Sequence, residues 1–135
     1  MKKLSVISGA AIILGMLVFG FLYKPQTSSA QVIQAGPKNH SRKIDKRNGR
    51  WKIDSTRAKK RDYVTFHADG SDMYFQFMDK KLFGHYKYQC LNGDSLRLPI
   101  KNTAVPGKEY RYAVFVLKEK VYAEGDSPPV IIVER

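Results

Sequence analysis

The chain has 135 residues, a formal net charge of +12 and a single cysteine. One cysteine excludes a framework of disulfides within the chain, and the length leaves room for one small domain behind any targeting segment. The sequence contains no recognisable motif for catalysis, metal binding or nucleotide binding, so its patterns indicate location and architecture rather than activity.

A nearly unbroken apolar run occupies residues 4–23, directly after Lys2 and Lys3. A basic start, an apolar stretch and the small residues 28–30 ahead of Gln31 are typical of a cleaved signal peptide. Roughly 20 apolar residues also suffice to span a bilayer as a retained anchor. Both alternatives stay open for residues 1–30. Both predict that the rest of the chain is secreted or lies at the outer face of the cell membrane.

Residues 31–48 are polar and rich in turn-forming residues, which predicts a flexible linker. Basic side chains gather in residues 38–61, which hold eleven Lys or Arg against two Asp. Such a stretch attracts polyanions, and we expect anionic lipid or teichoic acid of a Gram-positive envelope as partner. The alternative is a solvated linker that its own charge keeps extended. The candidate polyanion-binding residues are Lys38, Arg42, Lys43, Lys46, Arg47, Arg50, Lys59, Lys60 and Arg61.

Residues 49–135 alternate between apolar and polar side chains in short runs, which is typical of half-buried β-strands. No helical segment of any length is visible after residue 23. The pattern therefore predicts an all-β domain of seven or eight short strands, in an antiparallel sheet that closes on itself or folds as a sandwich. Asn92-Gly93 predicts a hairpin turn, because both residues tolerate positive φ. The expected strands cover residues 51–54, 63–67, 73–78, 84–90, 96–100, 110–117, 121–122 and 130–133.

Two single residues of this domain carry a structural expectation. Trp51 opens the first expected strand, and we expect its ring to be buried at one end of the domain. Cys90 lies on the same alternation as Tyr86 and Tyr88, which favours a buried thiol over one that pairs between chains.

Several short motifs follow one another in a fixed order. Gly49-Arg50-Trp51 comes first, residues 63–70 form a strand that ends in an Asp-Gly turn, and residues 84–88 and 92–98 follow an aromatic strand. This order resembles the small lipocalin-like domains of bacterial exported proteins. The resemblance implies a small antiparallel up-and-down β-barrel over residues 49–135. It carries over no catalytic residue and no cofactor.

The aromatic side chains are too many for one small core, so some of them must lie on the surface or line a cavity. They are candidates for binding an apolar ligand or a protein partner. We select Tyr74, Tyr86, Tyr88, Tyr110 and Tyr112.

Metal binding is not expected from the histidines or acids. His67 and His85 could face each other across neighbouring strands, but no third ligand accompanies them at metal spacing. Asp69, Asp72 and Asp79 bracket an expected turn without the spacing of a calcium loop, which favours turn capping.

The sequence thus indicates a non-enzymatic accessory protein outside the cell that binds an envelope component, a small apolar ligand or a protein partner. One alternative is a subunit of an envelope-spanning secretion or conjugation machine. A second is an unrecognised envelope hydrolase, for which no catalytic residue can be named. Nucleic acid is not an expected partner, because an exported chain rarely meets it and the basic stretch has few aromatic residues for base stacking.

Overall fold

The computed structural model describes residues 35–125 and 128–135. The predicted signal peptide or anchor at residues 1–30 and the start of the predicted linker lie outside these ranges. No helix in the described part of the chain is long and apolar enough to cross a bilayer. The strands are β1 (Asn39–Arg47), β2 (Arg50–Lys52), β3 (Thr56–Ala58), β4 (Tyr63–Ala68), β5 (Met73–Phe77), β6 (Lys87–Cys90), β7 (Ser95–Pro99), β8 (Glu109–Val116), β9 (Val121–Tyr122) and β10 (Val130–Val133).

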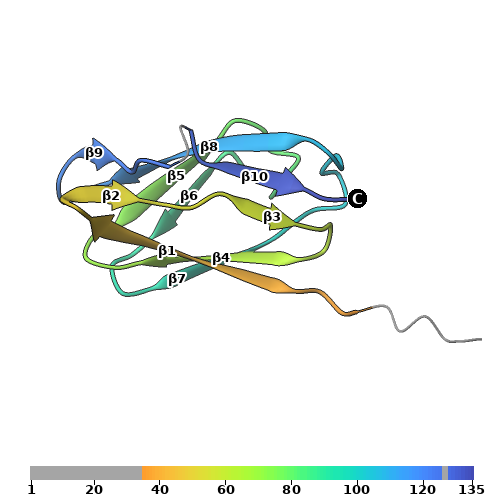
Figure 1. The fold of residues 1–135 in the computed structure, drawn as a ribbon, viewed down its shortest axis with the longest axis horizontal. Helices are drawn as coiled ribbons and strands as arrows, with labels where there is room; N and C mark the ends of the chain where they lie inside the picture. Colours follow the sequence, from red (N-terminus) through yellow and green to blue (C-terminus); the bar gives the residue numbers. More distant parts are fainter. Residues whose placement is uncertain (1–34, 126–127) are drawn as a thin grey trace, which may run out of the picture. The chain divides into compact units, whose positions relative to one another are not determined.

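These strands form two sheets that face each other as a sandwich (Figure 1). The first sheet has the order β2-β1-β4-β7. The second has the order β3-β10-β8-β5-β6, and the short strand β9 adds to β8. The prediction of an all-β domain is therefore confirmed.

The predicted closed barrel is wrong. An up-and-down barrel needs antiparallel neighbours throughout, whereas here β1 runs parallel to β4 and β3 runs parallel to β10. After β2 the chain leaves the first sheet to form β3 in the second, and it returns to the first sheet as β4. A period-two pattern locates strands but does not specify their neighbours, and for that reason the crossover was not predicted.

The predicted hairpin at Asn92-Gly93 is also wrong, although the turn itself is present. Gly93 adopts the expected positive φ of 84°. The strands on either side, β6 and β7, belong to different sheets, so the turn joins the two layers of the sandwich. The expected strand over residues 84–90 is shorter in the structure, where β6 begins only at Lys87.

The core lies between the inner faces of the two sheets. On β5, Met73, Phe75 and Phe77 are buried while Tyr74 and Gln76 face outward, as the alternation predicts. Phe66 on β4 places its ring 4.8 Å from that of Phe75. Such tilted aromatic contacts add to the apolar area that a domain of this size can bury. The predicted burial of Trp51 and of Cys90 is confirmed.

Half of the predicted linker, residues 31–48, is an ordered strand. Strand β1 spans Asn39–Arg47 and pairs with six consecutive residues of β4. Only Ile44 of this strand is a buried apolar residue. The partly buried positions His40 and Arg42 on the same side of the strand are polar, so the sequence lacks the apolar alternation that would have marked a strand. Order therefore begins well before residue 49.

Candidate functional site

The end of the sandwich at which β1 begins is called the basal end here. Parallel pairing places Asn39 beside Tyr63, and antiparallel pairing places Pro99 beside the same residue. Strand β10 ends at the same level, because Val133 pairs with Ala58 at the end of β3. The basal end is thus built from residues 35–38, 59–62, 78–86, 100–108 and 134–135, on the right of Figure 1.

The loops of the basal end carry a strong excess of positive charge. They hold nine Lys or Arg against three Asp or Glu, a net of +6, and all nine cations are exposed. One of the acids, Asp62, is buried, and a second, Asp79, pairs with Lys108 at 2.7 Å. The surface at this end is therefore more positive than the net count suggests. The nine cations are Lys38, Lys59, Lys60, Arg61, Lys80, Lys81, Lys101, Lys108 and Arg135.

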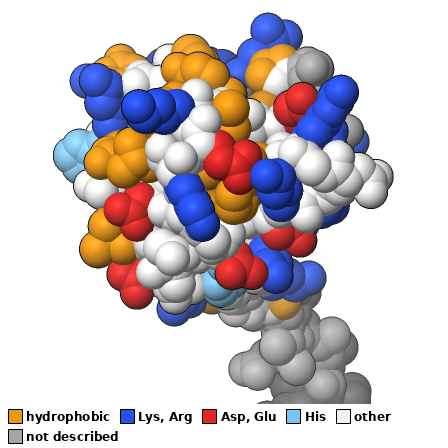
Figure 2. All heavy atoms as spheres, turned by 90° about the vertical axis from the view of Figure 1, so that its left-hand side faces the viewer, with side chains coloured by type: hydrophobic (Ala, Val, Ile, Leu, Met, Phe, Trp, Pro, Cys, Tyr) orange, Lys and Arg blue, Asp and Glu red, His pale blue; other side chains and the backbone are white. Residues whose placement is uncertain are grey.

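The opposite end, called the distal end here, has the reverse balance. Its described connections are residues 48–49, 69–72, 91–94, 117–120 and 123–125, with five Asp or Glu against two Lys, a net of −3. Figure 2 looks onto this end and shows acidic and basic side chains interspersed on its surface. The connections at the two ends thus carry net charges of opposite sign.

Asp62 organises the basal end. Its carboxylate accepts hydrogen bonds from the backbone N–H groups of Lys38 and Lys59, both at 2.9 Å, and His40 Nε2 lies 2.8 Å from Oδ2. Burial of this carboxyl raises its pKa, but the two N–H groups and His40 favour the charged form more strongly, so the net pKa is lowered. One side chain thus holds the start of β1 against the turn that presents Lys59 and Lys60.

The structure divides the nine predicted polyanion-binding residues into two groups. Lys38, Lys59, Lys60 and Arg61 lie at the basal end. The other five lie along β1 and β2 and have partners within the domain. These contacts are Arg42 to Thr56, Lys43 to Asp69, Lys46 to Glu119, Arg47 to Asp45 and Asp54, and Arg50 to Glu124. Sequence reasoning missed the other five cations of the basal end, which come from segments distant in the chain: Lys80, Lys81, Lys101, Lys108 and Arg135.

The five predicted binding tyrosines are not on one surface. Tyr110 and Tyr112 belong to the core, and burial raises the pKa of the Tyr112 hydroxyl well above its usual value. Tyr88 is half-buried and donates its hydroxyl hydrogen bond to the carbonyl of Phe83 at 3.0 Å. Only Tyr74 and Tyr86 are exposed, on β5 and in the loop before β6. Tyr74 and Tyr88 contribute to a groove that also includes the unpredicted residues Phe115 and Tyr122.

The histidines lie apart from one another. His67 bridges Ser41 on β1 and Ser95 on β7, with Nε2 to Oγ at 2.7 Å and Nδ1 to Oγ at 2.6 Å. His85 lies in the loop before β6, beside the ring of Tyr88. His67 and His85, which could have faced each other across neighbouring strands, do not do so. Among the described residues, no three His, Cys, Asp or Glu side chains are grouped to hold a metal ion.

The Ser41–His67–Ser95 contacts involve a histidine and hydroxyl groups, as nucleophilic catalysis does. They lie exposed across the outer face of the first sheet, and none of the three residues lines the groove of Tyr74 and Tyr88 on the second sheet. The three side chains therefore form a hydrogen-bonded link between strands β1, β4 and β7.

Comparison with known proteins gives no relative: no family model matches the chain, and neither a curated protein nor a solved structure is significantly similar to it. The interpretation therefore rests on the geometry of the domain itself.

Proposed function

We propose that this protein is a non-enzymatic binding module, secreted or held at the outer face of the cell membrane, whose basal end binds the anionic headgroups of a bilayer. The charges of the connections support this proposal, because those of the basal end sum to +6 and the described ones of the distal end to −3. The electrostatic field of such a charge distribution both attracts the domain to a negatively charged surface and turns its basal end toward that surface.

The position of the basal end in the chain also supports a lipid surface. The apolar run ends at residue 23, and eleven residues separate it from residue 35, where the described domain begins at this same end. Eleven extended residues span at most roughly 40 Å. Any retained anchor would therefore be joined to the domain at its basal end, by no more than this length of chain.

The binding surface is prepared by the fold. The Asp62 carboxylate accepts from the N–H of Lys59 within the turn of residues 59–62 and from that of Lys38 outside it. The carbonyl of Ile100 accepts from the N–H of Arg61 at 3.0 Å. Lys59, Lys60 and Lys101 therefore come from two loops that are bonded to each other. Each Lys or Arg near an anionic surface contributes about 1 kcal/mol of attraction.

The test uses residues 35–135, which form one compact unit with its own core. Sedimentation with vesicles containing phosphatidylglycerol should show binding that is absent with pure phosphatidylcholine vesicles and that falls as salt rises above about 0.1 M. Combined Lys59→Gln, Lys60→Gln and Lys101→Gln changes should weaken binding about 100-fold. The matched control changes the same number of cations elsewhere, with Lys43→Gln, Lys118→Gln and Lys120→Gln.

Equal loss in both triple variants would mean that net charge alone drives binding and would overturn the role of the basal end. A separate arm adds soluble poly(glycerol phosphate). If this polymer binds the parent domain while the vesicles do not, the surface recognises a wall polymer of the teichoic acid type instead of lipid.

A further inference from the structure

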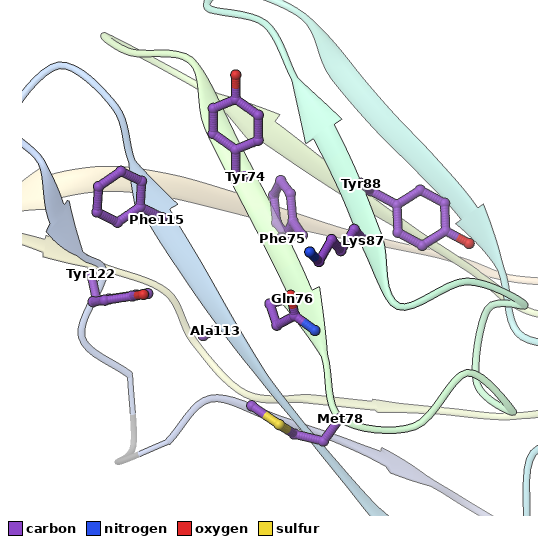
Figure 3. Close-up of a pocket in the computed structure, with 9 residues that line it drawn as sticks. All are labelled: Tyr74, Phe75, Gln76, Met78, Lys87, Tyr88, Ala113, Phe115 and Tyr122. Atoms are coloured by element: carbon purple, nitrogen blue, oxygen red, sulfur yellow. The ribbon is translucent and has the colours of Figure 1, made fainter.

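A groove on the outer face of the second sheet is distinct from the basal end. It has a volume of about 450 Å³ and lies over β5, β6, β8 and β9 (Figure 3). A volume of this size is within the usual range of small-molecule sites, about 300–1,000 Å³. The lining residues are Tyr74, Phe75, Gln76, Met78, Lys87, Tyr88, Ala113, Phe115 and Tyr122.

The hollow arises from the register of the strands. Ala113 on β8 lies opposite Gln76 on β5, and the neighbouring row places Tyr74 opposite Phe115 and Phe115 opposite Tyr122. A methyl group therefore occupies one position of the sheet surface beside a row of three rings. The outward side chains thus leave a depression above Ala113, which Figure 3 shows between Gln76 and Tyr122.

The rings beside this depression are partly held in place before any ligand binds. Phe115 and Tyr122 meet at a centroid distance of 5.2 Å in an edge-on arrangement. The amide nitrogen of Gln89 donates to the Tyr74 hydroxyl at 3.2 Å. Yet Tyr74 is 42% exposed, Met78 63% and Tyr122 66%. Large apolar side chains left this exposed on one face mark a binding surface.

The charge at the groove has one sign. Lys87 is the one charged residue among the nine that line the groove. In the described part of the chain it has no ion-pair partner. The next outward residue of β8 toward the basal end is another cation, Arg111. A ligand with an acidic group would supply the missing counter-charge, whereas a cationic ligand would be repelled.

We propose that this groove binds a small amphipathic anion. Its apolar body, about the size of one or two rings, lies on Ala113 between the aromatic side chains. Its carboxylate, sulfonate or phosphate group lies against the Lys87 ammonium. This site is separate from the lipid surface proposed for the basal end, so either proposal can fail without the other.

Two dyes with the same aromatic skeleton serve as probes for residues 35–135. One, 8-anilinonaphthalene-1-sulfonate, carries an acidic group, and the other, N-phenyl-1-naphthylamine, does not. Ala113→Leu fills the depression and should weaken the fluorescence-monitored binding of both dyes more than tenfold. Lys87→Met keeps most of the side chain's apolar stem. It should weaken the sulfonate dye about tenfold, a typical loss for a contact to a charged group, and leave the neutral dye unchanged.

Lys118→Met is the matched control, since it removes an exposed cation from the β8–β9 turn outside this groove. Urea denaturation checks that each variant is folded. The proposal is overturned if the parent binds neither dye, if Ala113→Leu leaves binding unchanged, or if Lys87→Met weakens both dyes equally. It is also overturned if sedimentation reveals a dimer that Ala113→Leu dissociates, because the groove would then be an interface between two copies.

Discussion

The two ends of the sandwich are closed by different chemistry. At the distal end the Trp51 ring lies beneath the β4–β5 turn, so close that an ideal Cβ on Gly70 would be 3.2 Å from its Cη2 atom. At the basal end a buried carboxylate, that of Asp62, collects two backbone N–H groups and a histidine. The packing of Trp51 at the distal end depends on shape, whereas the hydrogen bonds of Asp62 at the basal end depend on its ionisation. This difference predicts that acid acts on the basal end first.

The largest expected effect is at the distal end. Trp51→Ala should lower the free energy of unfolding by about 3–5 kcal/mol, because the ring is buried and its removal leaves a cavity. Urea denaturation of residues 35–135 measures this loss. Tyr86→Ala removes an exposed aromatic side chain at the basal end and should leave the midpoint nearly unchanged. A Trp51→Ala midpoint close to that of the parent would show that the ring does not close the distal end.

At the basal end, Asp62→Ala should cost about 3 kcal/mol, because it leaves the N–H groups of Lys38 and Lys59 without their acceptor. The same denaturation experiment detects it. Asp69→Ala is the control, since Asp69 pairs with Lys43 in an exposed contact that should contribute little. If both changes have the same small effect, the carboxylate of Asp62 is not what holds the basal end.

Acid should weaken the contacts of Asp62 at the basal end before it affects the packing of Trp51 at the distal end. The Asp62 pKa is lower in the folded chain than in the unfolded chain, for which about 3.9 is usual. Its stabilising contribution is therefore complete well above that value and is lost as the pH falls through the folded pKa. Urea midpoints of the parent and of Asp62→Asn should differ most near neutral pH and converge as the pH falls below about 5. A pH-independent difference would contradict this assignment.

The smallest expected effect concerns the turn above Trp51. Gly70 and Gly93 both have positive φ, of 94° and 84°, but only Gly70 faces the tryptophan ring. Gly93→Ala should cost about 1 kcal/mol from backbone strain alone, and Gly70→Ala should cost more because of the added contact. In a Trp51→Phe background, which shortens the ring, the two costs should become similar. If Gly70→Ala still costs more than Gly93→Ala in that background, the extra cost does not come from the contact with the tryptophan ring.

The distal end was the easier part to predict from the sequence. Trp51 stands at the head of an alternating run, and its burial follows from local pattern and size. The same reasoning located β5 and β8 and the buried side of Cys90. These features depend on which face of a strand each residue occupies, and a period of two reveals that face directly.

The basal end could not be predicted in the same way. Strand β1 is held by pairing with β4, and its polar side chain His40 finds its partner Asp62 far along the chain. The basic surface collects loops separated by up to about a hundred positions, from Lys38 to Arg135. The sequence shows where the cations are dense, but only the crossover between the sheets determines which of them share a surface.

The parallel pairing of β1 with β4 has a mechanical consequence. Any tension that reaches the domain through residue 35 enters along the axis of β1, whose backbone bonds to β4 lie across that axis. Pulling therefore loads the six paired residues together in shear, whereas a hairpin opened from its free end would release its bonds one at a time. Strand β1, whose polar sequence did not predict a strand, is thus the element through which the domain resists force. The rate at which the domain unfolds under such force is set by its unfolding barrier.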